Sequence, residues 1–271
     1  MNETMPKQVF FHVGLGKTGS IFLQYRVFPK LQGIKYIQRT NYRDFKYVKL
    51  IENSSDQRFL ISNGFDRQLE KEANNIASKY PQARIIIVLR RHDSWIASQY
   101  RRYVKNGYPK TFEEFIDIEN DKGDWEQKDL YFYPKLIMLK ELFGSRPLVL
   151  FHDELVNNPH IFIEKICAFI GVDYDIESIN LKRKHTSYSE KQLKVRRQLS
   201  AKKSRSQSVL SKKYWVRRIQ VFMRMPERYL SLFVANLIPS KWISDEPLIS
   251  KESVRKVRAF YEEDWQKCQE Y

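Results

Sequence analysis

Cysteine is scarce in this chain of 271 residues, which contains only Cys167 and Cys268. Both fall in segments with a helical pattern, and their spacing is not that of metal ligands. A disulfide-rich scaffold and a zinc module are therefore excluded as fold classes. We expect two reduced thiols in a cytosolic chain.

Long apolar runs are also missing. The longest candidate, residues 229–239, is too short to cross a bilayer, which takes about 20 apolar residues. Residues 1–7 are polar, and the apolar run after them is too short for the core of a signal peptide. The sequence predicts a cytoplasmic protein, with 229–239 as a candidate for peripheral contact at the inner membrane face.

Acidic residues are the third shortage. Lysine and arginine number 48 against 32 acids, which gives a net charge of +16 and a pI near 9.6. Residues 182–218 hold 14 of the basic residues and one acid, Glu190. Charge of this size favours polyanionic partners such as nucleotide phosphates, nucleic acid, acidic glycans or anionic membranes.

The apolar residues that are present alternate between strand and helix patterns. Buried strands are predicted at residues 8–13, 59–62, 84–89 and 147–151, and the third of these reads RIIIVL. Helical patterns lie between them, which is typical of a parallel sheet with crossover helices. We expect a single α/β domain with a P-loop-like parallel sheet flanked by helices. Its nucleotide-binding core spans 8–181, and a basic, mainly helical extension spans 182–271.

Two local expectations follow from this pattern. Residues 20–31 are predicted to form a helix with a buried stripe of Ile21, Phe22, Tyr25 and Phe28. Asp66 is predicted to be the N-cap of a helix beginning at Arg67.

A glycine-rich segment, VGLGKTGS over residues 13–20, joins the first strand to the first helix. Glycines let backbone amides turn toward an anion, the helix N-terminus adds partial positive charge, and Lys17 adds a full charge. The segment is not a Walker A loop, because that motif needs glycine where this chain has Phe11. It is either a phosphate loop or an ordinary glycine-rich turn with an exposed lysine.

Arg90 and Arg91 follow the central strand, and Ser98 comes eight residues after Arg90. Ligands of open α/β sheets bind at the carboxyl ends of the strands, and guanidinium groups suit phosphate better than metal. No carboxylate pair lies near the loop, so no metal is expected. Asp153, in LVLFHDE, resembles a Walker B residue and is the best argument for a P-loop kinase or NTPase. We favour a structural turn there.

Together these segments resemble the sulfotransferases that use 3'-phosphoadenosine-5'-phosphosulfate (PAPS), especially bacterial and carbohydrate-type members. FHVGLGKTGS resembles the family's 5'-phosphosulfate loop, with Gly16 in place of the usual proline; RRHDSWIAS resembles its 3'-phosphate motif. FHDELV with Pro159 resembles a structural segment of the family. The resemblance implies that PAPS and its product PAP are bound by Gly16, Lys17, Thr18, Gly19, Ser20, the backbone of Ile21, Arg90 and Ser98. It also implies a basic closing loop, within which Arg183 and Lys184 are the candidates.

The resemblance further implies a mechanism for Lys17, which would stabilise negative charge on the leaving 5'-phosphate. The family's general base, a histidine or glutamate after the second strand, has no counterpart in ISNGFD, residues 61–66. Asp66 is the nearest carboxylate and the candidate base, although we favour its capping role. His12 is interpreted as a packed core histidine.

The acceptor is expected to be a hydroxyl of a glycan or glycolipid. Arg101, Arg102 and Lys105 favour an anionic acceptor if they line the cleft, and are otherwise a solvated helix face. Residues 212–239 mix aromatic and basic residues, as in a helix lying on an anionic membrane. The non-enzymatic alternative is a nucleic-acid-binding protein that uses residues 182–218, although the sequence contains no specific recognition motif for nucleic acid.

Overall fold

The structure, a computed structural model, describes residues 7–175, 177–181, 188–204 and 229–271. Its contacts divide the chain into two compact units. The first unit comprises Met1–Arg91, Tyr131–Lys182 and Glu262–Tyr271; the second comprises His92–Leu130 and Arg183–Tyr261. The chain therefore leaves the first unit after Arg91 and again after Lys182.

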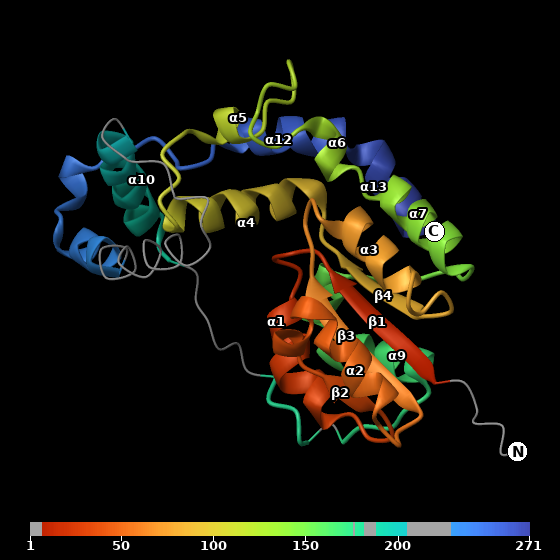
Figure 1. Ribbon diagram of the computed structural model, residues 1–271. Helices are drawn as coiled ribbons and strands as arrows, with labels where there is room; N and C mark the ends of the chain where they lie inside the picture. Colours follow the sequence, from red (N-terminus) through yellow and green to blue (C-terminus); the bar gives the residue numbers. More distant parts are fainter. Residues whose placement is uncertain (1–6, 176, 182–187, 205–228) are drawn as a thin grey trace, which may run out of the picture. The chain divides into compact units, whose positions relative to one another are not determined.

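A parallel sheet of five strands forms the centre of the first unit. The strands lie in the order β2-β3-β1-β4-β5 (Figure 1). Their bounds are β1 Gln8–Gly14, β2 Lys35–Ile37, β3 Arg58–Gly64, β4 Arg84–Leu89 and β5 Leu148–Phe151. The predicted α/β class and four predicted strands are confirmed. β2 was not predicted, because three residues at a sheet edge carry too little pattern.

Side chains of the inner strands are buried on both faces of this sheet. On one face, Phe10, Leu60 and Ile86 pack in a single core with residues of the helices that follow β1 and β5. On the other, Phe11 stacks on Tyr42 with ring centroids 6.0 Å apart. The helices of this unit are α1 Ser20–Phe22, α2 Lys46–Glu52, α3 Leu69–Ala77, α7 Tyr133–Phe143, α8 His152–Asn157, α9 Pro159–Ile170 and α13 Glu262–Glu270.

The segment after β1 departs from the predicted regular helix. α1 is a single turn, followed by a π-helix over Leu23–Val27 and a 3-10 turn over Phe28–Lys30. The N–H of Phe28 donates to the carbonyl of Leu23, five residues back, so the helix is widened at this turn. The segment buries Leu23, Gln24, Val27 and Phe28, whereas Ile21 and Tyr25 are exposed by 57% and 60%. The predicted stripe is therefore wrong for Ile21 and Tyr25, which lie on the outer side of the segment.

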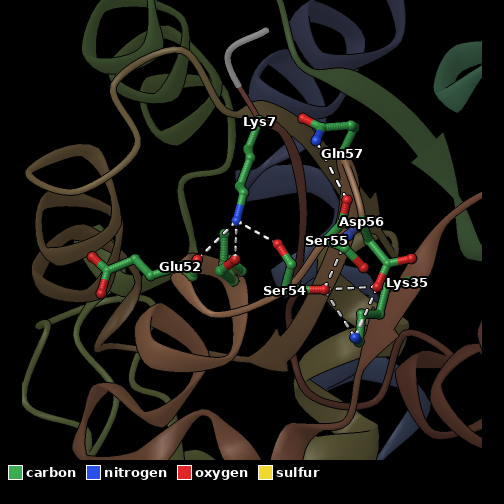
Figure 2. Close-up of polar contacts among 8 residues, drawn as sticks. Lys7, Lys35, Glu52, Ser54, Ser55, Asp56 and Gln57 are labelled. Atoms are coloured by element: carbon green, nitrogen blue, oxygen red, sulfur yellow. Dashed lines mark hydrogen bonds and ion pairs between the residues drawn. The ribbon is translucent and has the colours of Figure 1, made fainter. Parts of the chain in front are cut away.

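A polar network fixes the edge of the sheet where the strands begin (Figure 2). The ammonium of Lys7 donates to the carbonyls of Ile51, Glu52 and Ser54, which lie at the end of α2 and just after it. These are the carbonyls that a helix leaves without intrahelical partners. Lys35 forms an ion pair with Asp56 at 2.8 Å, so β1, β2 and the turn before β3 are held together.

The second unit is helical in its described part. Its helices are α4 His92–Lys105, α5 Phe112–Phe115, α6 Gln127–Leu130, α10 Glu190–Ser204 and α12 Lys251–Phe260, and residues 229–237 are also helical. A capping box of Thr111 and Glu114 starts α5. Inside this unit α4 packs against α10 and α12, and Trp95 meets Trp125 edge to face at 5.2 Å. No helix in the described ranges is both long and apolar enough to cross a bilayer.

Candidate functional site

The glycine-rich loop lies between the end of β1 and the start of α1 in the first unit. Lys17 has a φ of 71°, in the left-handed region, and its side chain is exposed. Such a φ is unfavourable for a residue with a Cβ, and it persists only where the surrounding structure imposes it. The hydroxyl of Thr18 turns inward and donates to the carbonyl of Leu15 at 2.6 Å. The loop is therefore closed on itself, with its lysine turned outward.

Gly19 is required by both conformation and space. Its φ is 92°, and a Cβ at this position would lie 2.4 Å from Cδ2 of Leu155. The carbonyl of Gly19 then accepts hydrogen bonds from the N–H groups of Phe22 and Leu23 at 2.9 and 3.2 Å. The same glycine thus ends the loop and starts the helix. The proximity of Leu155, from α8, to Gly19 could not be predicted from the sequence pattern.

Asp66 holds the loop from the end of the neighbouring strand β3. Its Oδ1 accepts a hydrogen bond of 2.8 Å from the backbone N–H of Gly16, and the N–H of Phe65 donates to the carbonyl of Gly14 at 2.8 Å. The predicted capping role is wrong, because α3 begins at Leu69 and Gln68 is its N-cap. The N–H of Gly16 is therefore already hydrogen-bonded to a carboxylate of the chain itself, that of Asp66.

Arg90 brings the second predicted phosphate motif to the first. β1 and β4 are neighbouring parallel strands, so their carboxyl ends lie at one edge of the sheet. Nη1 of Arg90 donates to the carbonyl of Lys17 at 3.3 Å. A guanidinium carries five N–H donors, and here one of them binds the loop backbone. The structure therefore groups two cationic residues, Lys17 and Arg90, that the sequence places 73 positions apart.

The other predicted ligands have different positions. Ser20 is buried at the start of α1, and Ile21 is exposed. Ser98 lies on α4 in the second unit and is half-buried. Arg183 and Lys184 lie outside the described residues, so the closing loop remains a prediction.

Three buried polar residues underlie the loop, and sequence reasoning singled out only His12 among them. Nδ1 of His12 lies 2.8 Å from Oγ of Ser62, which also accepts from Nε2 of Gln24 at 3.0 Å. The imidazole is fully buried, which lowers its pKa from 6.5 to about 3. A histidine this hard to protonate does not supply the missing base at neutral pH, so its interpretation as a core residue is supported.

The Walker B candidate lies in the first turn of α8. The side chain of Asp153 is 71% exposed, while Glu154 beside it forms an ion pair with Lys165. Oδ1 of Asp153 lies 3.7 Å from Nδ1 of His152, so the neighbours of both carboxylates belong to α8 and α9. In the described part of the chain no group of three or more histidine, cysteine or acidic side chains has the arrangement of a metal site.

The three basic residues on α4 have neighbours within the second unit. The guanidinium of Arg102 lies 5.5 Å from the ring centre of Tyr103, and the ammonium of Lys105 lies 5.0 Å from that of Tyr188. Arg101 interacts electrostatically with Glu190. These contacts give the three a structural role, and their role toward an acceptor stays a prediction.

Sequence comparison places residues 38–176 in a family model described as the sulfotransferase family. The match covers more than half of the chain and begins after the phosphate loop. Comparison with the curated protein sequences gives no significant match.

Comparison of folds also finds sulfotransferase structures, at low sequence identity. A sulfotransferase from Alicyclobacillus acidocaldarius is 16% identical, with a TM-score of 0.53, over 88% of this chain and 99% of that one. Mouse sulfotransferase SULT7A1, complexed with PAP, is 15% identical, with a TM-score of 0.51, over 98% of this chain and 90% of that one. At these identities the two structures establish the fold alone.

Proposed function

Because this chain belongs to the sulfotransferase family, we propose that it transfers a sulfuryl group from PAPS to an acceptor hydroxyl. The observation that carries the proposal is the hydrogen bond between Arg90 and the carbonyl of Lys17. It joins the two predicted phosphate motifs at the carboxyl ends of neighbouring strands, where open α/β sheets bind nucleotides. The PAP complex of the mouse neighbour is consistent with the choice of nucleotide.

The residues present fit a nucleotide with phosphate groups at both the 5' and the 3' position. Lys17 and the amides of the loop suit the 5'-phosphosulfate, and Arg90 suits the 3'-phosphate through its planar fork of donors. Ser98 joins Arg90 in this assignment through the family motif. The N–H of Gly16 donates to Asp66, so in this state Gly16 serves the loop itself.

The reaction is a displacement at sulfur. A bond forms between the acceptor oxygen and sulfur, the bond from sulfur to the 5'-phosphate oxygen breaks, and the hydroxyl proton leaves to a base. Negative charge grows on the departing phosphate, so the exposed ammonium of Lys17 stabilises the transition state more than the ground state. The loop holds Lys17 in its unusual backbone conformation, which fixes where the side chain begins. PAPS itself supplies the activated sulfuryl group.

Calorimetric titration of the full chain with PAP and with ATP–Mg tests the nucleotide. Binding of PAP in preference to ATP–Mg is expected, followed by transfer of radiolabelled sulfate from PAPS to glycan acceptors. Tight binding of ATP–Mg without measurable binding of PAP would overturn the proposal and favour a P-loop kinase. Anisotropy titration with duplex and single-stranded DNA across salt concentrations tests the nucleic-acid alternative, for which micromolar binding at physiological salt would be required.

For the acceptor, we propose a glycan or glycolipid hydroxyl presented at an anionic membrane surface. The support comes from the helical residues 229–237, a described stretch that contains no charged residue. Leu232 and Ala235 are buried in its packed side. Large apolar side chains elsewhere on the helix are exposed, and so is Trp242 a few residues after it; the exposed residues are Tyr229, Leu230, Phe233, Val234, Leu237 and Trp242.

Basic groups accompany this apolar surface. Lys191 donates to the carbonyl of Asn236 near the end of the helix, and Lys241 is exposed next to Trp242. Apolar and aromatic side chains beside lysines are the chemistry that binds the interface of an anionic membrane. The part of the predicted helix before residue 229 lies outside the described residues.

Vesicle flotation tests the docking. The protein is expected to float with vesicles that contain phosphatidylserine at low salt and to stay in solution with neutral vesicles. Replacing Leu230, Phe233 and Leu237 by glutamine should abolish flotation, whereas Ile161→Gln, at a site on α9 that is 51% exposed, should not. If the wild-type protein remains soluble with acidic vesicles at low salt, a soluble acceptor replaces the membrane-bound one.

A further inference from the structure

His12, Ser62 and Gln24 form a buried hydrogen-bonded group directly below the phosphate loop. His12 and Ser62 are opposite each other on β1 and β3, and Gln24 comes from the π-helix after the loop. His12 and Ser62 are fully buried and Gln24 is 4% exposed. Two of their atoms, Nε2 of His12 and Oε1 of Gln24, are buried without a hydrogen-bond partner among the described residues. Buried polar atoms without partners are costly and call for a physical reason.

The direction of the hydrogen bonds follows from counting protons. Ser62 Oγ accepts from Nε2 of Gln24, and its own single proton then needs an acceptor. Nδ1 of His12, at 2.8 Å, is that acceptor. Nδ1 therefore carries no proton, and in the neutral imidazole the proton lies on Nε2. The unpartnered atom of His12 is a hydrogen-bond donor.

Cε1 of the imidazole lies close to Gly14 at the beginning of the loop, and Ser20 at the end of the loop lies close to the same glycine. A Cβ on Gly14 would lie 2.9 Å from Cε1 of His12 and 2.0 Å from Oγ of Ser20. Cε1 is bonded to both ring nitrogens, so Nε2 is one bond away from the imidazole atom that approaches Gly14, and the Ser20 hydroxyl approaches the same glycine. That hydroxyl has only long contacts, 3.4 Å to Oγ1 of Thr18 and 3.5 Å to the carbonyl of Leu15. The Ser20 hydroxyl can give up these two contacts at little cost in free energy, because hydrogen bonds of this length are weak.

We propose that His12 is a positioning residue that acts through Ser20 when the loop holds an anion. In that state Nε2–H of His12 donates to Oγ of Ser20, and the Ser20 hydroxyl donates its proton to the anion. The chain then runs in one direction from Gln24 through Ser62, His12 and Ser20, and each bond polarises the next. The role of the anion as the 5'-phosphosulfate group rests on the proposed function.

The tautomer of His12 is the first test, because it is read in the ligand-free protein. In ¹⁵N-histidine spectra that correlate ring nitrogens with ring protons, His12 should show a protonated Nε2 and an unprotonated Nδ1, with its signal identified by loss in His12→Asn. With Gln24 turned so that Oε1 faces Ser62, the polarity would reverse and Nδ1 would carry the proton. An Nδ1–H tautomer overturns the proposal whether or not the protein binds PAP.

Coupling between His12 and Ser20 is the second test. His12→Asn retains an acceptor for Ser62 but has no atom at the Nε2 position, and Ser20→Ala removes the hydroxyl. Each variant should weaken PAP binding about tenfold, and the double variant should bind about as weakly as Ser20→Ala alone. If the losses of PAP affinity in the two single variants multiply in the double variant, His12 acts independently of Ser20, and the proposed coupling is overturned. Wild-type protein that binds no PAP would instead refute the proposed function, while the tautomer still decides the direction of the chain.

Discussion

Asp66 and Gly16 are joined by a hydrogen bond of 2.8 Å between a carboxylate oxygen and a backbone N–H. The bond links the segment after β3 to the phosphate loop, so Asp66, the carboxylate nearest in sequence to the expected position of the base, is already used to hold the loop. Asp66 was the candidate base in the sequence, and its geometry favours a role in loop positioning.

Two substitutions separate these roles of Asp66. Asp66→Asn keeps an oxygen that accepts the Gly16 N–H, so it should retain PAP affinity and most of the turnover. Asp66→Ala should lose about tenfold in PAP affinity, because it leaves the amide without its charged acceptor. Calorimetry and a sulfate-transfer assay measure both. Loss of turnover by a factor of about a hundred or more in Asp66→Asn would restore the base assignment.

Lys17 should matter more for turnover than for binding. Lys17→Met keeps the length of the side chain and removes its charge, and kcat should fall about a hundredfold or more while the affinity for PAP changes much less. The control is Lys30→Met, an exposed lysine at the end of the 3-10 turn Phe28–Lys30, which should leave both unchanged. Equal losses in kcat and affinity at Lys17 would reduce its role to phosphate binding.

Arg90 should recognise the 3'-phosphate. The wild-type protein should bind PAP more tightly than AMP, which has no 3'-phosphate, and Arg90→Ala should remove most of that preference by weakening PAP about tenfold or more. Lys79→Ala, which removes an exposed charge after α3, controls for general electrostatics. If Arg90→Ala weakens PAP and AMP to the same extent, the guanidinium acts on the loop through the Lys17 carbonyl instead.

Gly19→Ala should destabilise the loop for two separable reasons. Its left-handed φ costs an alanine about 1–2 kcal/mol, and the new methyl group meets Leu155. Adding Leu155→Ala should remove the steric contribution to this destabilisation and leave the contribution of the left-handed φ. Urea denaturation and PAP titration of the single and double variants measure this. Full recovery in the double variant would contradict the conformational contribution.

His12 should make folding sensitive to acid. Burial lowers its folded-state pKa to about 3 from 6.5, so between these values the unfolded chain binds a proton that the folded chain does not. The free energy of unfolding should therefore fall as pH falls below 6.5, by up to about 1.4 kcal/mol per pH unit from this group. Urea denaturation from pH 7 to pH 4 should show a shallower dependence in His12→Asn. Identical slopes would mean that His12 is protonated inside the fold.

The parallel α/β sheet could be predicted from the sequence, since four of its strands have continuous apolar patterns and glycine-rich or polar ends. The family could also be predicted, because the spacing of Arg90 and Ser98 and the loop around Lys17 are local features. Local patterns failed where tertiary contacts decide how a side chain is used. The segment after the loop buries Leu23, Gln24 and Val27 rather than Ile21 and Tyr25, and Asp66 accepts a hydrogen bond from Gly16 instead of capping a helix.

Which distant residues act together depends on how the strands assemble. Parallel pairing brings His12 opposite Ser62 and sets Arg90 beside the Lys17 carbonyl, and no spacing along the chain encodes either contact. Gln24 is an ordinary helical residue in the sequence, yet folding buries its amide against Ser62. Composition and periodicity report the burial of a segment, whereas the partner of a buried polar atom depends on strand order and register, which are properties of the assembled sheet.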